Sequence, residues 1–196
     1  MNTQHKKNRI TILVVFAMSI IPFGIAWYLA DNPGKIKLGT NKGDLITPPL
    51  TTELTDFSGH DSFSAENINE LKGHWILINL MPKAQCAQAC QDGLYKTQQI
   101  SLMMGKDIAR IRRLAVIFNQ ADQPLPKQWQ DDARLLKTVP SLKLRETLAK
   151  IVSNTEEGGL LVMDPLGNLM MKYAPGYDPY NVRNDLSKLL RISQIG

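Results

Sequence analysis

The sequence contains few cysteines and histidines, the residues that most often act as nucleophiles, acid–base groups or metal ligands. Its 196 residues include two cysteines and three histidines. We find no Ser–His–Asp arrangement, no glycine-rich phosphate loop and no cysteine–histidine spacing of the kind that binds zinc. These absences argue against a hydrolase or a kinase. The chain also has no internal repeat or low-complexity tract, and its length suggests a single domain.

An excess of one charge is also missing from most of the chain. The formal net charge is +5, but Lys6, Lys7 and Arg9 stand in the first 30 residues without any acid. Removing these three charges leaves only +2 for the rest, which is too little for a nucleic-acid-binding surface. A later basic cluster is interpreted as the solvated end of a helix rather than a phosphate site: Lys106, Arg110, Arg112 and Arg113.

One long apolar run is present, from Ile10 to Ala30, without a single charge. A helix of about 20 residues crosses a hydrocarbon core of about 30 Å. We therefore predict residues 1–9 as a cytoplasmic N-terminus and residues 10–30 as a transmembrane helix, with the rest of the chain outside the cytoplasm. A cleaved signal peptide is the alternative. We favour an uncleaved anchor because the run is long and Tyr28 would occupy a position that cleavage reserves for a small residue.

Residues 31–64 are rich in Pro, Gly, Thr and Asp. This composition favours a spacer and a partly extended arm, with Gly43–Ile46 as a candidate edge strand. We therefore predict that the folded domain covers residues 65–196.

The two cysteines lie where a strand leads into a helix. The apolar run 75–81 predicts a buried strand, and 91–104 has helical periodicity. Sites of open α/β sheets usually lie at the carboxyl ends of strands. Cys86 and Cys90 are four residues apart, so their Cα atoms would be roughly 6 Å apart on one helix face. That spacing permits a disulfide or a dithiolate site for Cu(I).

Three interpretations of the cysteine pair remain open. An inert disulfide suits an oxidising compartment, but it would close a very small loop and stabilise the fold only modestly. A redox pair or a copper site explains the position better, and we favour a functional pair. The helix N-terminus should activate Cys86, whereas Cys90 shares a helix stripe that we expect to face the sheet.

The rest of the chain predicts an α/β fold. We expect a second strand at 114–119, helices at 127–139 and 142–152, a hairpin built from 160–163 and 169–173, and a last helix capped by Asp178. Trp129, Ala133 and Leu136 share one face of the expected 127–139 helix. A strand, a cysteine-bearing helix, a strand and a later hairpin describe a thioredoxin-like sheet flanked by helices, preceded here by one transmembrane helix.

The segments Gly73–Leu80, Cys86-x-x-x-Cys90 and Leu161–Gly167 follow one another along the chain. In that order they resemble the SCO/SenC family of membrane-anchored, thioredoxin-like proteins that deliver copper to cytochrome c oxidase. A second set consists of the arm Asn41–Pro49, the Cys86–Cys90 loop and the hairpin Asp164–Met170. With the N-terminal anchor it resembles more closely the single-pass membrane proteins of bacterial cytochrome c oxidase gene clusters, and this likeness spans nearly the whole chain.

The resemblance implies that Cys86 and Cys90 bind copper or exchange disulfides. The family's third copper ligand is a histidine before the hairpin, and here Thr155, Glu156 and Glu157 stand in that place. We interpret the two glutamates as part of a solvated loop rather than a ligand pair. The chain also lacks the two-residue cysteine spacing and the proline before the hairpin that thioredoxin-type oxidoreductases use.

Met81 and His60 are the candidates for a third copper ligand. Met81 stands close to the cysteines in sequence, and His60 lies in a loop that can fold toward them. His74 stands at the opposite end of the strand, some 20 Å away at about 3.3 Å per residue. His5 is predicted to be cytoplasmic.

These expectations describe a non-enzymatic assembly factor for cytochrome c oxidase, held in the bacterial inner membrane with its C-terminal domain in the periplasm. Copper is the expected cofactor or cargo. An oxidase subunit or another assembly factor is the expected partner. Two alternatives from other classes are a membrane-bound thiol–disulfide oxidoreductase and a non-catalytic thioredoxin-like scaffold.

Overall fold

The computed structural model describes residues 3–32, 40–81, 86–118, 125–151 and 157–193. They fall into two units, Met1–Thr40 and Asn41–Gly196. Helix α1 (Thr3–Asp31) makes up the described part of the first unit apart from Asn32 and Thr40.

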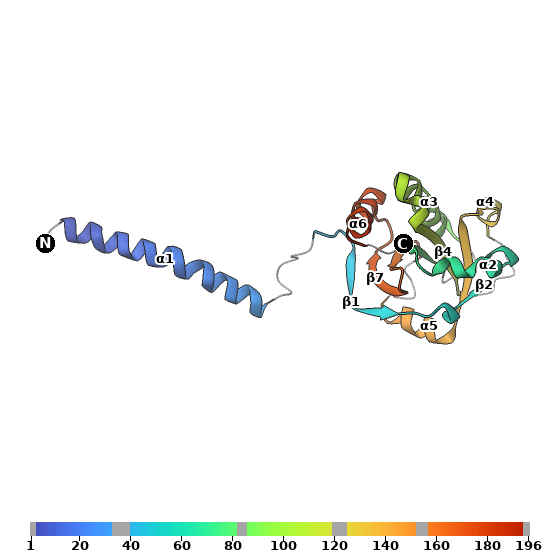
Figure 1. The fold of residues 1–196 in the computed structure, drawn as a ribbon, viewed down its shortest axis with the longest axis horizontal. Coiled ribbons are helices and arrows are strands. Elements are labelled where there is room, and N and C mark those ends of the chain that lie inside the picture. The colour runs from blue at the N-terminus through green and yellow to red at the C-terminus, as the bar shows by residue number, and fades with distance from the viewer. Residues whose placement is uncertain (1–2, 33–39, 82–85, 119–124, 152–156, 194–196) are drawn as a thin grey trace. The chain divides into compact units, whose positions relative to one another are not determined.

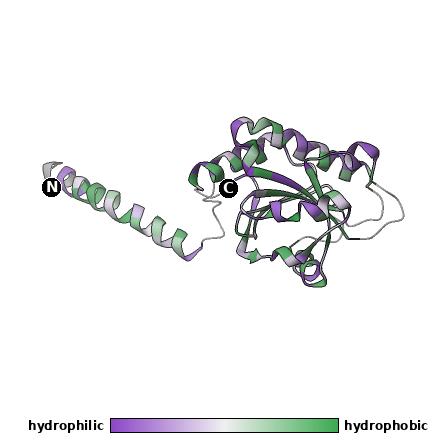
Figure 2. Cartoon of the chain, turned by 45° about the vertical axis from the view of Figure 1, so that its right-hand side comes forward, coloured by the Kyte–Doolittle hydropathy of each residue, from purple (hydrophilic) through white to green (hydrophobic). Residues whose placement is uncertain are grey.

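Helix α1 confirms the predicted N-terminal apolar helix. Between Lys7 and Asp31 it is long and apolar enough to cross a membrane, and no other helix in the described ranges is. Its large apolar side chains are exposed, and apolar colouring covers most of its length in Figure 2.

In the described part of the second unit, seven strands form one mixed sheet in the order β1-β7-β6-β3-β4-β5-β2. The three strands β3, β4 and β5 are parallel, and the other pairings are antiparallel. The strands are β1 (Asp44–Thr51), β2 (Phe57–Gly59), β3 (Trp75–Met81), β4 (Ile111–Ile117), β5 (Leu135–Pro140), β6 (Leu160–Met163) and β7 (Asn168–Tyr173). This arrangement confirms the predicted thioredoxin-like α/β fold.

Helices cover both faces of the sheet (Figure 1). They are α2 (Ser62–Glu66), α3 (Gln88–Met103), α4 (Lys127–Gln130), α5 (Leu142–Ala149) and α6 (Pro179–Ile192), with 3-10 helices at Leu54–Asp56, Ile68–Leu71 and Gly105–Arg110. Alternate residues of β3 point to opposite faces. Ile76 and Ile78 join a core with Leu144 and Leu148 of α5, whereas Leu77 packs with residues of α3 and α6. Because β3 is buried on both faces, its residues are apolar at every position except Asn79 rather than alternating between apolar and polar.

The folded unit begins before the residue-65 boundary that composition suggests. Strand β1 pairs with β7 at one edge of the sheet, where its two prolines are tolerated and the register shifts between Leu45 and Leu50. The Lys42 and Gly43 amides donate to Asp185 Oδ2 of α6 at 2.6 and 3.1 Å. The arm is therefore part of the sheet and is fastened to the last helix.

Tyr173 contributes to the same attachment. Its hydroxyl donates to Asp185 Oδ2 at 2.9 Å. Burial raises the pKa of Tyr173, and the neighbouring Asp185 raises it further. The phenol is therefore kept protonated and acts as a donor.

The closing elements follow the predicted order. The hairpin β6–β7 turns at 164–167, and the Asp178 side chain accepts from the Tyr180 amide to cap α6.

Strand β4 begins three residues earlier than predicted, so Arg113 lies inside the strand. Its side chain is buried and pairs with Asp132 at 2.5 Å. The prediction of a solvated helix end is therefore wrong for Arg113.

The predicted helix over 127–139 is also wrong. Only Lys127–Gln130 is helical, and Leu135–Pro140 forms β5 parallel to β4. The segment had the helical spacing Trp129–Ala133–Leu136, but its second half alternates between the two faces of the sheet. Pairing with β4 and β2 overrides that local pattern, as tertiary contacts often do.

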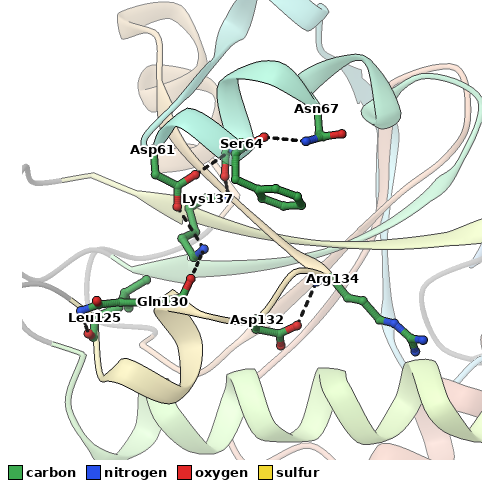
Figure 3. A network of polar contacts seen from close by, with 9 residues as sticks. Asp61, Ser64, Asn67, Leu125, Gln130, Asp132, Arg134 and Lys137 are labelled. Carbon is green, nitrogen blue, oxygen red and sulfur yellow. Dashed lines mark hydrogen bonds and ion pairs between the residues drawn. The ribbon is translucent and has the colours of Figure 1, made fainter.

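Buried Lys137 in β5 is held by a polar network drawn in Figure 3. Its Nζ donates to Asp61 Oδ2 at 3.0 Å and to the Gln130 carbonyl at 2.9 Å, while its amide donates to Ser64 Oγ. Burial alone would raise the pKa of Asp61, but hydrogen bonds from Ser64 and Lys137 outweigh it and lower that pKa. The network satisfies a charge that a central strand otherwise excludes.

Candidate redox and metal site

Cys86 and Cys90 are joined in a disulfide, with their Cα atoms 5.2 Å apart. The pair follows the carboxyl end of β3, where sites of α/β sheets are usually found. Helix α3 begins at Gln88, with Ala87 as its N-cap. Cys86 therefore precedes the helix, and Cys90 lies in its first turn.

The two sulfur-bearing residues differ in exposure. Cys90 is 3% exposed and packs with Leu94 and Trp129, whereas Cys86 is only half-buried at the rim of the same cluster. Cys90 continues the buried stripe of α3 that the sequence predicts, with Gly93, Thr97, Ile100 and Met104. Cys86 is therefore the more exposed residue of the pair, and Cys90 is the shielded one.

The structure places the two candidate third ligands differently. Met81 is the last residue of β3 and packs in the same apolar cluster as both cysteines. His60 follows β2, which lies three strands from β3, or roughly 14 Å at about 4.8 Å per strand. His74 stands at the start of β3, as predicted, with Nδ1 3.0 Å from the Lys72 carbonyl.

The prediction of a solvated loop is wrong for Glu157. This residue is 7% exposed, and its Oε1 accepts from the Ala87 amide at 3.1 Å. That amide lies between the two cysteines. Thr155 and Glu156 fall outside the described residues. The sequence offers one hint of this position. In the SCO/SenC proteins that the chain resembles, the third copper ligand stands in the segment that corresponds to residues 155–157.

Two glycines hold the Glu157 segment against α3. Gly158 has φ +84°, and a Cβ there would lie 2.5 Å from the Ala89 carbonyl oxygen. A Cβ on Gly93 would lie 3.3 Å from Gly158 Cα and 3.5 Å from Asn79 Oδ1. Asn79 Nδ2 donates to Thr97 Oγ1 at 3.0 Å beneath this contact. The loop and the helix can approach this closely because glycine has no side chain at either position.

Tyr177 supports α3 from the side. Its hydroxyl lies 3.4 Å from the Gly93 carbonyl, its own carbonyl accepts from Lys96 Nζ at 2.9 Å, and the ammonium lies 5.0 Å from the ring centre. Burial raises the pKa of Tyr177, so the hydroxyl remains a donor.

A shallow groove of about 350 Å³ lies between α3 and α4. The Gln91 side chain, which lines it, donates to the Cys86 carbonyl at 3.1 Å. Glutamine side chains dominate its lining: Gln88, Gln91, Asp92, Tyr95, Gln98, Gln128 and Trp129.

Comparison with protein families gives a match over residues 75–193 to the model of transmembrane-like, thioredoxin-like C-terminal domains. The chain belongs to this family. A comparison of the sequence with curated proteins finds no match. The matched residues include β3, the disulfide, α3 and Glu157, so the whole candidate site lies inside the family domain.

Solved structures similar to this thioredoxin-like chain include SCO proteins. Apo Sco1 from Thermus thermophilus has a TM-score of 0.55 at 15% identity, covering 79% of this chain and 99% of its own. A SCO1/SenC family lipoprotein from Bacillus anthracis has 0.51 at 15%, with 74% and 99% covered. BsSco, described as a cytochrome c oxidase assembly protein with a disulfide switch, has 0.50 at 14%, with 81% and 100% covered. The predicted likeness to SCO/SenC proteins is confirmed at the level of the fold.

In the part of the chain that the structure describes, we find no group of three or more His, Cys, Asp or Glu side chains that could hold a metal ion. The candidate donors that the structure brings together are the two sulfurs, with Met81 in the same apolar cluster.

Proposed function

We propose that this protein is a membrane-anchored assembly factor for cytochrome c oxidase that works through reversible reduction of Cys86–Cys90. In its reduced form the pair carries Cu(I) as cargo or reduces the copper-site cysteines of the oxidase. Helix α1 serves as an uncleaved anchor in the bacterial inner membrane, and the thioredoxin-like domain faces the periplasm.

The exposure difference within the disulfide is the observation that carries the proposal. In thiol–disulfide exchange a thiolate attacks one sulfur and the other leaves. Half-buried Cys86 is the sulfur that a partner can reach, and buried Cys90 is the one that closes the pair again. An inert disulfide needs no difference in exposure between its two cysteines. Closing so small a loop also stabilises the fold only modestly.

The exchange reaction has two steps. The Cys86 thiolate attacks a partner disulfide, so a mixed disulfide forms and one partner thiolate leaves. The Cys90 thiolate then attacks the Cys86 sulfur and releases the partner's second thiolate. Two electrons pass to the partner, and Cys86–Cys90 is again a disulfide, which an external dithiol must reduce.

Cu(I) fits the donor set as cargo. Two thiolates on residues whose Cα atoms lie 5.2 Å apart are soft ligands suited to Cu(I). Among the described residues of the apolar cluster that holds both cysteines, Met81 is the one further sulfur donor. The site therefore suits transient binding of copper by two sulfurs better than permanent storage. The SCO-like fold supports this assignment only by analogy.

The test is an anaerobic titration of the reduced full chain in detergent micelles with Cu(I) against a chromophoric Cu(I) chelator. We expect one Cu(I) per chain, and loss of binding in Cys86→Ser and in Cys90→Ser. Met81→Leu weakens binding if the thioether is a donor, and Met103→Leu, at the end of α3 and packed against another apolar cluster, is the matched control.

Exchange with a peptide disulfide is measured on the same samples. Exchange without Cu(I) binding would favour the alternative, a membrane-bound thiol–disulfide oxidoreductase. Absence of both activities would overturn the proposal and leave a non-catalytic scaffold.

A further inference from the structure

Glu157 places a carboxylate at the N-terminus of the helix that carries the cysteines. Ala87 is the N-cap of α3 and has no side chain that can cap. The carboxylate that accepts from its amide comes from Glu157, 70 residues further along the chain. A helix N-terminus carries a partial positive charge and stabilises a nearby anion. Here that anion is supplied by the protein itself.

The position of the carboxylate is built into the fold. Glu157 is 7% exposed, so water screens its charge poorly. The following residue, Gly158, packs directly on Ala89 of the first turn of α3, with no room for a side chain. Since β6 begins at Leu160 and pairs with β3, the segment is tied to the central sheet as well.

We propose that Glu157 is a positioning residue that sets the reduction potential of the Cys86–Cys90 pair and biases it toward the disulfide. Glu157 thereby makes the dithiol a stronger electron donor to its partner. This inference rests on the proposed function, because it assumes that the pair is reduced and reoxidised.

The bias follows from competition for one helix end. Reduction breaks the S–S bond and adds two electrons, and any negative charge that stays on sulfur lies at the N-terminus of α3. There it would gain the stabilisation that lowers the thiol pKa at helix N-termini. A buried carboxylate already bonded to the Ala87 amide takes part of that stabilisation and repels a second anion. Reduction is therefore less favourable with Glu157 than without its charge.

The experiment compares reduction potentials of the full chain in detergent micelles, equilibrated at pH 7 in dithiothreitol buffers and trapped by alkylation. Glu157→Gln keeps an oxygen that can accept from the Ala87 amide but removes the charge. We expect the equilibrium constant for reduction to rise about tenfold, which is about 30 mV for this two-electron couple. Glu157→Ala should shift it in the same direction.

Glu146→Gln is the matched control, because Glu146 is exposed on α5, which covers the other face of the sheet. It should leave the potential unchanged. A purely structural Glu157 would leave the Gln variant at the wild-type potential, and that result, or a lower potential in both variants, overturns the inference. If the wild-type pair cannot be reversibly reduced at all, the proposed function fails instead.

Discussion

Reducing the disulfide should cost the thioredoxin-like domain only a modest part of its stability. The cysteines are four positions apart in sequence. For so small a loop, the chain-entropy relation gives a loss of about 2 kcal/mol in the free energy of unfolding. A 15-residue loop would give about 3 kcal/mol by the same relation. The value is small enough for the reduced domain to stay folded.

The same free energy describes the redox chemistry. The disulfide stabilises the fold by about 2 kcal/mol. By thermodynamic linkage, folding stabilises the disulfide by the same amount, so the equilibrium constant for oxidation is about 30 times larger in the folded than in the unfolded chain at 25 °C. Folding thus biases the pair toward oxidation without locking it.

Urea unfolding of residues 41–196 measures this difference. The fragment holds every buried residue of the described core. With a slope of roughly 2 kcal/mol per molar, the midpoint should fall by about 1 M when the disulfide is reduced, and equally in the double variant Cys86→Ser/Cys90→Ser. Failure of the reduced domain to fold would identify a structural disulfide and contradict a reversibly reduced pair. An unchanged midpoint would refute the calculated constraint.

Three further predictions concern the described contacts. Gly158→Ala should lower the free energy of unfolding by about 2 kcal/mol or more, because its φ is positive and the new Cβ meets the Ala89 carbonyl; urea unfolding measures it. Asp61→Asn keeps the acceptor for the Ser64 amide but removes the carboxylate beside buried Lys137, so we expect a loss of about 2 kcal/mol at pH 7 by the same assay. The pKa of Asp61 is lowered in the fold, so its charge stabilises the fold above its ordinary value of 3.8 and this contribution disappears as the pH falls through the lowered pKa. Acid titration should therefore destabilise the wild type more than Asp61→Asn below about pH 4, and parallel curves would contradict this.

The sequence predicts those parts of the fold whose local signals agree with their tertiary role. The apolar run of β3, the stripe of α3, the turn at 164–168 and the Asp178 cap each specify one element unambiguously. The 21-residue uncharged run at 10–30 predicts α1 for the same reason. In each case burial or capping follows from residues close together in the chain.

The failures share a different cause. Strand β5 has residues with helical spacing, and only pairing with β4 and β2 makes it a strand. Arg113 and Lys137 look like surface residues until Asp132 and Asp61 are brought to them from other elements.

Glu157 belongs with these failures. It accepts from an amide 70 residues away, and nothing in its neighbourhood in the sequence specifies that contact. The sequence therefore indicates the candidate site through its cysteines, whereas the carboxylate beside them is found only in the three-dimensional structure.

We propose that the protein acts through its two sulfurs. This is tested in the native host by replacing the protein with the variant Cys86→Ser/Cys90→Ser and measuring the copper content and activity of cytochrome c oxidase in isolated membranes. At unchanged levels of the variant protein, we expect oxidase copper and activity to be lost. Oxidase with full copper and full activity would refute a function through the sulfurs.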